Sequence, residues 1–207
     1  MTIARPHPSM IKLLTQAPNR RSQAPSVKKW TREQFQSLGD FGAFEGARAC
    51  LIDGIIYEGG PMGPAHAIGI RKMTRILDRL FPNVPHVRAQ LPFNVGKATD
   101  PLPDFAVVPG TDDDYLTNHP DTALLIVEIC DESLNFDLTV KAEKYAEAAV
   151  PEYWAVDLNG KCLHVLRQPG PLAPGGFAFA DQCVLVPGDS VSPLAAPNAT
   201  VNVADFF

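Results

Sequence analysis

The stretch 124–129 is a run of apolar side chains with one acidic residue inside it, Leu-Leu-Ile-Val-Glu-Ile. A short unbroken apolar run is typical of a strand that other elements cover on both faces. A carboxylate on such a strand is unfavourable unless it is paired, hydrogen-bonded or bound to a cation. The run therefore predicts an interior strand, and it predicts a partner for Glu128.

The rest of the chain alternates β-favouring segments with helical ones. Helices are expected over 31–38, 65–80 and 137–149, with Asp137 as the N-cap of the last. Strands are expected at 48–52, 55–58, 86–95, 104–108, 123–129, 152–157, 161–167, 177–186 and 199–203, with hairpin turns at Asp53-Gly54 and Asn159-Gly160 and a loop at 169–176. This pattern predicts an α/β or α+β fold, in which a mixed β-sheet is flanked by helices and carries added β-hairpins.

Basic residues are concentrated at the start of the chain. Residues 1–29 hold six Lys or Arg, four Pro and no acidic residue, whereas the other 178 residues carry 12 basic and 23 acidic groups, a balance of -11. The first segment offers little to pack, and the length of the remainder suits one domain. We therefore expect a basic, irregular arm over 1–29 and a single domain over 30–207.

Several classes of protein are disfavoured by what the chain lacks. No run approaches the ~20 apolar residues of a membrane helix, and the first 30 residues lack the roughly 7–15-residue apolar stretch of a secretory signal. The four cysteines show neither a Cys-x-x-Cys pair nor a zinc-type His spacing, which argues against a disulfide scaffold or a zinc knuckle. The net charge of -5 argues against a protein that coats nucleic acid, although a local basic patch stays compatible with it. A cytoplasmic protein without membrane contact is expected.

Two carboxylates are expected to meet at one end of the sheet. If 104–108 and 123–129 pair antiparallel, the start of the first strand lies beside the end of the second. Asp104 and Glu128 then face a shared space, and a divalent cation would relieve their repulsion. Hard oxygen ligands favour Mg²⁺ or Mn²⁺. The plainer alternative is a turn aspartate and a strand-end glutamate that only forms a salt bridge with a helix lysine.

A lysine on the following helix completes this group. Lys141 lies at the edge of the expected buried stripe and can lean toward the strand ends, whereas Lys144 is expected to reach water. An ammonium beside a metal-bound water can orient it and can offset charge on a phosphoryl oxygen. Two acids, a metal and a lysine together suit the hydrolysis of a phosphodiester.

These residues carry a resemblance to a known family. Asp104 and Glu128, with twenty-three residues between them, resemble the PD-(D/E)XK nuclease superfamily, and the longer pattern is similar to its Uma-type "putative restriction endonuclease" family. The similar blocks are Leu51-Ile-Asp-Gly54, His66, Gln90, Pro103-Asp-Phe-Ala-Val-Val108, Ile126-Val-Glu-Ile129, Asp137-x-x-x-Lys141-x-x-x-Tyr145 and Val150-Pro-Glu-Tyr-Trp-Ala-Val-Asp157. The resemblance implies a restriction-endonuclease-like fold in which Asp104 and Glu128 hold the metal and Lys141 is the catalytic lysine.

The chain also departs from the family's pattern. The superfamily's lysine normally stands two places after the acid, where this chain has Cys130, and a glutamate commonly stands where it has Cys50. These departures favour an alternative in which the fold is a nucleic-acid-binding or oligomerisation module without turnover.

Further residues are candidates for the surroundings of the site. His66 is either a satisfied interior histidine or a proton carrier, and Gln90 is either an ordinary strand-edge amide or a donor to the ligand or to the metal's water shell. In the functional alternative both surround the metal ligands without binding the metal. Basic side chains form a stripe on the polar face of the 65–80 helix, which is either a solvated face or a surface that contacts phosphates: Arg71, Lys72, Arg75 and Arg79.

The first hypothesis is thus a Mg²⁺- or Mn²⁺-dependent endonuclease that acts on DNA. The second is the inactive module, and the third is a metal-dependent hydrolase of small phosphorylated or nucleotide substrates. A symmetric homodimer is expected for a small sheet protein of this kind.

Overall fold

The computed structural model describes residues 26–82 and 86–207. The predicted basic arm lies outside these residues, apart from 26–29. The helices are α2 (Arg32–Asp40), α3 (Pro64–Leu80), α4 (Leu134–Phe136) and α5 (Ala142–Glu147), with 3₁₀ turns η1 (Asp112–Tyr115) and η3 (Val203–Phe206) and a π-helical turn η2 (Asp137–Lys141). The strands are β1 (Arg48–Ile52), β2 (Ile55–Gly59), β3 (His86–Ala89), β4 (Phe105–Val108), β5 (Leu125–Cys130), β6 (Glu152–Asp157), β7 (Cys162–Pro171), β8 (Phe177–Leu185), β9 (Ser190–Val191) and β10 (Val201–Asn202).

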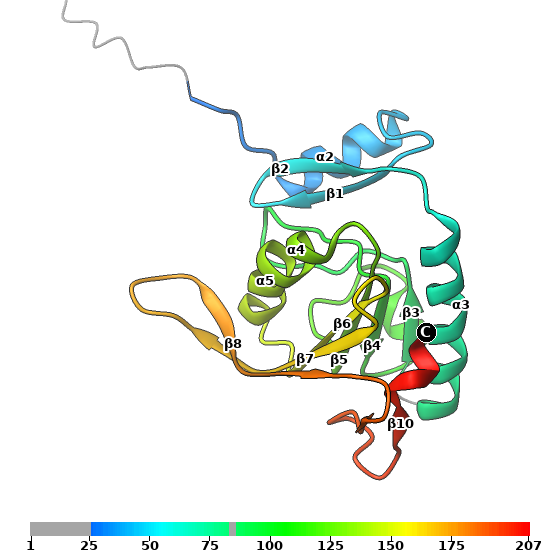
Figure 1. The fold of residues 1–207 in the computed structure, drawn as a ribbon. Helices are drawn as coiled ribbons and strands as arrows, with labels where there is room; N and C mark the ends of the chain where they lie inside the picture. Colours follow the sequence, from blue (N-terminus) through cyan, green and yellow to red (C-terminus); the bar gives the residue numbers. More distant parts are fainter. Residues whose placement is uncertain (1–25, 83–85) are drawn as a thin grey trace, which may run out of the picture.

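Six strands form one mixed sheet in the order β3-β4-β5-β6-β7-β8 (Figure 1). Only β5 and β6 run parallel to each other, and the other neighbours are antiparallel. Every residue of β5 and of β6 is buried. The prediction of an interior strand at 124–129 and of a mixed sheet flanked by helices is confirmed.

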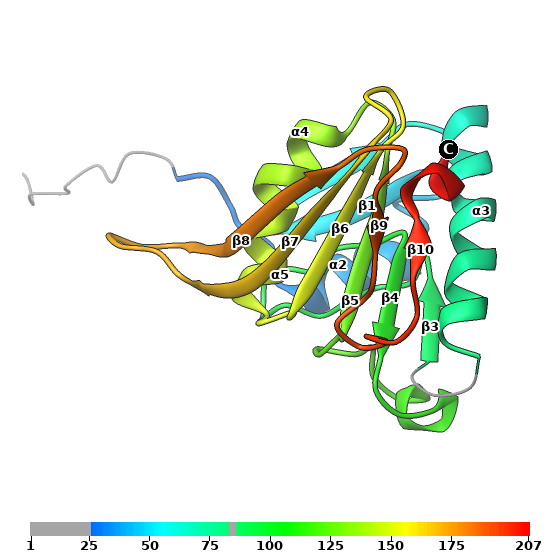
Figure 2. The ribbon, with the colours of Figure 1, turned by 60° about the horizontal axis from the view of Figure 1, so that its bottom comes forward.

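Helices and the C-terminal segment cover the two faces of this sheet. On one face α3 packs its apolar side against β4, β5 and β6, and the segment from β9 to η3 joins the same core (Figure 2). On the other face α5 packs against β5, β6 and β8. The connection from β5 to β6 runs through α4, η2 and α5, as parallel neighbours require a crossover. None of the helices in the described ranges is both long and apolar enough to cross a membrane.

The predicted hairpin at 48–58 is present but stands apart from the main sheet. β1 and β2 pair antiparallel as a separate two-stranded sheet, and the turn residues Asp53 and Gly54 have φ of 49° and 78°. Two consecutive residues with positive φ are typical of a type I′ turn, which suits a tight hairpin. The hairpin lies above α4 and α5 (Figure 1). It therefore stands over the end of the sheet at which the carboxylates were expected.

Two strand boundaries differ from the prediction by more than two residues. β3 ends at Ala89 instead of 95, because Gln90 has a φ of 54° and turns the chain out of the extended conformation. β7 continues to Pro171 and pairs there with Phe177, so the expected loop at 169–176 is shorter. Together β7 and β8 form a long hairpin that extends beyond the sheet (Figure 2).

The prediction of a helix over 137–149 capped by Asp137 is wrong at its start. The helical segment begins at Leu134, and Asp137 lies inside it, where its N–H donates to the carbonyl of Ser133 at 2.9 Å. The π turn η2 then adds a residue to one turn, which rotates the following side chains relative to a regular α-helix. Lys144 is buried, not directed to water as expected, because the β1–β2 turn covers it: its Nζ lies 3.0 Å from Asp53 Oδ1.

A buried carboxyl group beneath the hairpin makes stability depend on pH. Asp100 is 4% exposed, it pairs with Leu51 through the backbone, and its Oδ1 has no partner among the described residues. Burial raises the pKa of Asp100 to about 6, against the opposing effect of Arg32. The folded protein thus binds this proton more tightly than the unfolded chain, and the free energy of unfolding is expected to fall as the pH rises from about 4 to 6.

Asp100→Asn is therefore expected to stabilise the protein at pH 7.5 by about 2 kcal/mol and to have little effect near pH 4. Urea unfolding of both proteins at several pH values would measure this difference. The same substitution at the exposed Asp121 is the control, with an expected change below about 0.5 kcal/mol. A variant that is less stable than wild type at pH 7.5 would contradict the assignment.

Candidate active site

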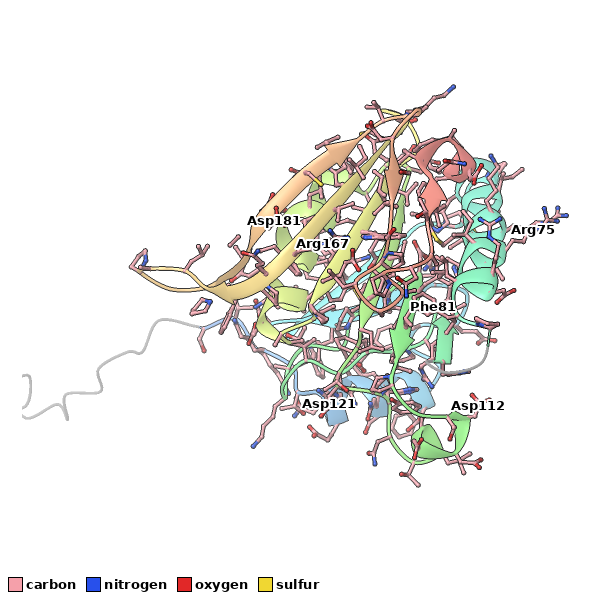
Figure 3. All side chains as sticks on the ribbon, turned by 90° about the horizontal axis from the view of Figure 1, so that it is seen from below. Arg75, Phe81, Asp112, Asp121, Arg167 and Asp181 are labelled. Atoms are coloured by element: carbon pink, nitrogen blue, oxygen red, sulfur yellow. The ribbon has the colours of Figure 1, made fainter. Side chains whose placement is uncertain are left out.

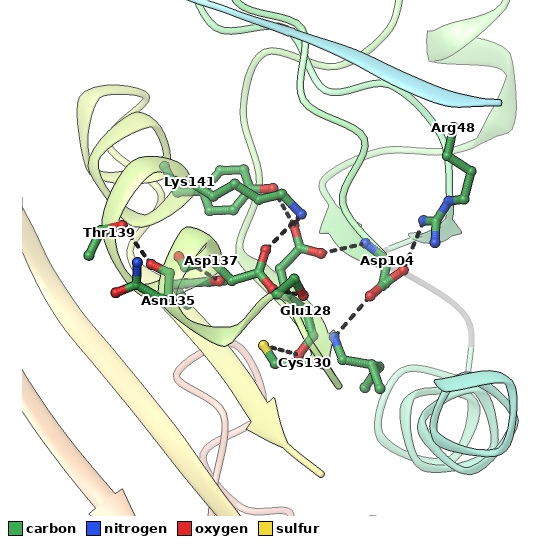
Figure 4. A network of polar contacts seen from close by, with 12 residues as sticks. Arg48, Asp104, Glu128, Cys130, Asn135, Asp137, Thr139 and Lys141 are labelled. Atoms are coloured by element: carbon green, nitrogen blue, oxygen red, sulfur yellow. Dashed lines mark hydrogen bonds and ion pairs between the residues drawn. The ribbon is translucent and has the colours of Figure 1, made fainter. Parts of the chain in front are cut away.

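The antiparallel pairing of β4 with β5 brings Asp104 beside Glu128. Phe105 pairs with Val127, so Asp104, one residue earlier, stands opposite Glu128. The Ile129 N–H donates to Asp104 Oδ2 at 2.9 Å, and the Asp104 N–H donates to Glu128 Oε2 at 3.3 Å (Figure 4). Each carboxylate is thus held by the backbone of the other's strand. The predicted convergence of the two acids is what the structure shows.

Glu128 is buried among groups of both signs. Its side chain is 2% exposed, and Oε1 accepts the Tyr145 hydroxyl at 2.6 Å and lies 3.0 Å from Lys141 Nζ. Burial raises the pKa of Glu128 to about 7; Lys141 opposes this shift, and the nearby carboxylates of Asp137 and Asp104 add to it. A proton or a cation is therefore favoured at this carboxyl group near neutral pH.

Asp104 behaves in the opposite way. Its Oδ1 lies 3.1 Å from Arg48 Nη2 and 3.2 Å from His66 Nε2. Burial acts to raise the pKa of Asp104, but the hydrogen bonds from His66 and from the Ile129 N–H together hold it below its usual value. Two adjacent carboxyl groups with pKa values moved apart are typical of sites that divide roles between two acids.

Lys141 reaches the site from the π turn. Its Nζ lies between Glu128 Oε1, at 3.0 Å, and Asp137 Oδ1, at 2.9 Å. Burial acts to lower the pKa of Lys141, but these two carboxylates raise it, so the ammonium stays charged. Lys144 turns to other partners: its Nζ lies 3.0 Å from Asp53 Oδ1 and 2.9 Å from Glu147 Oε2. The two lysines of this helix therefore serve different acidic groups.

The two paired acids and Lys141 line one cavity of about 300 Å³. Asp104, Glu128 and Asp137 lie in it with Lys141, and the hairpin contributes its other side through Arg48, Cys50, Tyr57 and the segment 58–60. The Tyr57 and Phe136 rings, 5.1 Å apart between centroids, connect the hairpin to α4. A concave site with a few convergent polar groups and perturbed pKa values is the arrangement expected of an active site.

Comparison with known proteins identifies the family. The model of the Uma2 family, described as "Putative restriction endonuclease", matches residues 32–204. The chain belongs to the Uma2 family. One similar solved structure is described as "a putative nuclease belonging to DUF820 from Anabaena variabilis ATCC 29413"; it has 15% sequence identity and a TM-score of 0.61 over 77% of this chain and 89% of that one. At this identity the likeness shows a common fold. None of the curated proteins with which the chain was compared matches it.

Two cysteines occupy positions at which this Uma2 chain departs from the pattern it resembles. Cys130 is buried, and its thiol donates to the Glu128 carbonyl at 3.8 Å, while Cys50 lines the cavity. Burial raises the pKa of Cys50 to about 11, and it raises that of Cys130 as well. Because their pKa values are raised, neither thiol supplies a charged group to the site near neutral pH.

The donor set of the Uma2 site fits a hard divalent cation. Three carboxylates, those of Asp104, Glu128 and Asp137, face two cationic side chains, Arg48 and Lys141, which leaves an excess of negative charge. Burial makes that excess unfavourable, as the raised pKa of Glu128 reflects. Asp104 and Glu128 are the residues that could hold Mg²⁺ or Mn²⁺ through oxygen ligands.

Of the other predicted residues, some lie at the cavity and others lie away from it. His66 contacts Asp104 and lines the cavity. Gln90 does not line the cavity: its backbone N–H donates to the Asp104 carbonyl at 3.0 Å. In the basic stripe of α3, Arg71 and Arg75 are exposed, and Arg75 projects away from the helix (Figure 3). Arg79 lies 4.0 Å from Asp205, and Lys72 lines a second, apolar cavity.

Three residues of the site were assigned no role from the sequence. Tyr145 and Asp137 were named only as members of a family-like block, with Asp137 also expected as a cap, although its spacing of four from Lys141 is that of a helical ion pair. Arg48 begins a strand that is not in the main sheet, so no local pattern links it to Asp104.

Proposed function

We propose that this chain is a Mg²⁺- or Mn²⁺-dependent endonuclease that hydrolyses phosphodiester bonds in DNA. The convergence of Asp104, Glu128 and Lys141 in one cavity supports the proposal most directly. Membership of a family described as "Putative restriction endonuclease" is consistent with it. The symmetric homodimer stays a prediction, because the structure describes a single chain.

The residues can divide the work of hydrolysis. Asp104 and Glu128 would hold the metal, which when bound polarises a phosphoryl oxygen and lowers the pKa of a bound water. Lys141 orients the attacking water and offsets the negative charge that develops on the phosphoryl oxygens. Asp137 keeps the Lys141 ammonium charged and directed toward Glu128. Water oxygen adds to phosphorus, one P–O bond of the backbone breaks, and the leaving oxygen takes a proton.

His66 is placed to assist with protons. Its Nε2 contacts Asp104 Oδ1, and its side chain is 14% exposed, within reach of the cavity. An imidazole beside a carboxylate can accept a proton from water or pass one to a leaving oxygen near neutral pH. We therefore assign proton transfer during hydrolysis to His66.

The exposed arginines of α3 suit a polyanionic substrate. Arg71 and Arg75 lie on the outer side of α3, whose first turn carries His66. Arginine side chains that neutralise phosphates release counterions, so binding weakens steeply as salt is raised. Affinity for duplex DNA should therefore fall with salt, and it should fall less steeply in Arg71→Gln/Arg75→Gln than in wild type.

Titration calorimetry with Mn²⁺ tests the metal site. Glu128→Gln is expected to lower the affinity at least about tenfold, because it removes a charged oxygen ligand and keeps the shape of the side chain. In wild type the affinity should rise between pH 6 and 8, since Glu128, with its pKa near 7, must lose a proton to bind.

Glu147→Gln is the matched control. Glu147 pairs with Lys144 outside the cavity and is half-exposed, so the same change there should leave Mn²⁺ affinity within about twofold. Equal Mn²⁺ binding by wild type and Glu128→Gln would remove the proposed metal site.

A second candidate function is favoured by one observation. Arg48 is paired with Asp104 at 3.1 Å and supplies positive charge where a metal is proposed. With Cys50 and Cys130 at the departing positions, this pairing suits a module that binds nucleic acid without cleaving it. Salt-dependent DNA binding without metal-dependent cleavage in wild type would favour this function over the nuclease.

A further inference from the structure

A group of metal-ligating side chains lies outside the carboxylate site, at the β6–β7 hairpin. Asp157 ends β6, Cys162 begins β7, and the two are direct partners in the antiparallel register. His164 follows two residues later and so faces the same side of the strand as Cys162. Cys162 Sγ lies 3.8 Å from Asp157 Oδ2 and 3.6 Å from His164 Nε2, and the three ligand atoms lie within 4.8 Å of one another.

These separations suit tetrahedral coordination. Bonds of roughly 2.3 Å to sulfur and roughly 2.0–2.2 Å to nitrogen and oxygen place neighbouring ligand atoms of a tetrahedral site about 3.3–3.6 Å apart. The two separations from Cys162 Sγ, 3.6 and 3.8 Å, are close to this. An ion of this class could therefore enter with small movements of the side chains.

The Asp157 carboxylate is held in place by its own turn. Oδ1 accepts the N–H groups of Asn159, at 3.0 Å, and Gly160, at 2.8 Å, so Oδ2 is left facing Cys162. A Cβ at Gly160 would lie 2.3 Å from Oδ2, so a side chain at this position would displace the carboxylate from Cys162. Groups that orient a ligand from behind are a regular part of protein metal sites.

We propose that Asp157, Cys162 and His164 form a second metal site, which takes a borderline divalent cation of the Zn²⁺ class. A thiolate and an imidazole select such a cation over Mg²⁺, which prefers oxygen ligands. Three protein ligands leave a fourth position for water, and the half-buried Cys162 and His164 leave access from solvent. On binding, the Cys162 thiol loses its proton to solvent, and its sulfur bonds to the ion.

This site is independent of the proposed nuclease function. Asp157 lies beside Cys130, two residues further along β6 than Ala155, the partner of Glu128. The site needs no Cys-x-x-Cys pair, because the register of the hairpin brings its ligands together. An ion there would tie β6 to β7 and stabilise the folded chain by mass action.

Titration of the full chain with Co²⁺ tests this proposal, because a thiolate bound to Co²⁺ gives a charge-transfer absorption that oxygen ligands do not. The titration uses Glu128→Gln, which removes the other proposed site. We expect one equivalent of Co²⁺ to produce the absorption, and Cys162→Ser in that background to abolish it. Competition with Zn²⁺ should show at least a thirtyfold loss of affinity in Cys162→Ser.

Cys183→Ser is the matched control, since Cys183 is exposed on β8 and has no part in the group. It should keep the absorption and the Zn²⁺ affinity. His164→Gln is the second variant, for use if Cys162→Ser folds poorly. It also removes a proposed ligand, so it should weaken Zn²⁺ binding. The proposal fails if the Glu128→Gln protein shows no thiolate absorption, or if the absorption survives Cys162→Ser.

Discussion

Lys141→Met is expected to lower the rate of metal-dependent DNA cleavage by roughly 10²–10³-fold, the usual effect of removing a positioned electrostatic group from an active site. Nζ of Lys141 is 3.0 Å from Glu128, so it is the one ammonium among the described residues that reaches the paired acids. Methionine keeps most of the side-chain volume and removes the charge. Single-turnover cleavage of a duplex DNA substrate with Mn²⁺ measures the effect.

Lys144→Met is the matched control for this experiment. Lys144 lies on the same helix, is similarly buried and also bridges two carboxylates, but those belong to Asp53 and Glu147, which do not line the cavity. We expect its cleavage rate to change by less than about threefold, although both variants should lose stability because each leaves acidic groups unpaired. Unfolding curves establish that both are folded at the assay temperature.

Mn²⁺ affinity separates catalysis from metal binding in these variants. Lys141→Met should keep it or raise it, because a positive charge beside Glu128 is removed. A Lys144→Met variant that loses cleavage while Lys141→Met retains it would show that the wrong lysine has been assigned. A tenfold loss of Mn²⁺ affinity in Lys141→Met would show that the lysine acts through the metal site alone.

The core of the candidate site was predictable because it depends on strand register. Antiparallel pairing of the two runs places the start of the first beside the end of the second, and a one-residue slip would turn the Glu128 carboxylate to the opposite face of the sheet, away from Tyr145 and Lys141. Asp104 and Glu128 then meet by necessity, and Lys141 follows from the helix that completes the crossover to β6. The positions of these three residues depend only on the pairing of two strands and on the helix that follows the second of them.

The rest depended on features that a local pattern does not contain. Lys144 is buried against the prediction because the hairpin turn at Asp53 packs over its helix, and these two segments are far apart in the chain. Arg48 reaches Asp104 only because the hairpin stands over the end of the sheet, which is a matter of tertiary packing. The group at Asp157, Cys162 and His164 comes from the register of a predicted hairpin, and it was missed because it lacks the Cys-x-x-Cys and His spacings that are typical of zinc sites.

The Val-Pro-Glu-Tyr-Trp block, prominent in the resemblance, has a structural explanation in Glu152. This carboxylate is fully buried: Oε1 accepts from Trp154 Nε1 at 2.9 Å and from Arg167 Nη2 at 2.6 Å, and Oε2 accepts the Leu194 N–H at 2.7 Å. Arg167 also donates to the Ser192 carbonyl at 2.8 Å. Glu152 and Arg167 thus tie the C-terminal segment to β6 and β7, and the core of the sheet beneath it depends on them.

Arg167→Met is therefore expected to lower the free energy of unfolding by about 3–5 kcal/mol, because it leaves a buried carboxylate without its cation. Urea unfolding at pH 7.5 measures the loss. Adding Glu152→Gln should recover much of it, since the amide needs no counter-charge, and the double-mutant cycle gives the coupling between the two residues. Arg79→Met is the control: its ion pair with Asp205 is 4.0 Å long and exposed, so a change below about 0.5 kcal/mol is expected. Equal losses in Arg167→Met and Arg79→Met would mean that Glu152 is neutralised by other means, and the block would need a different explanation.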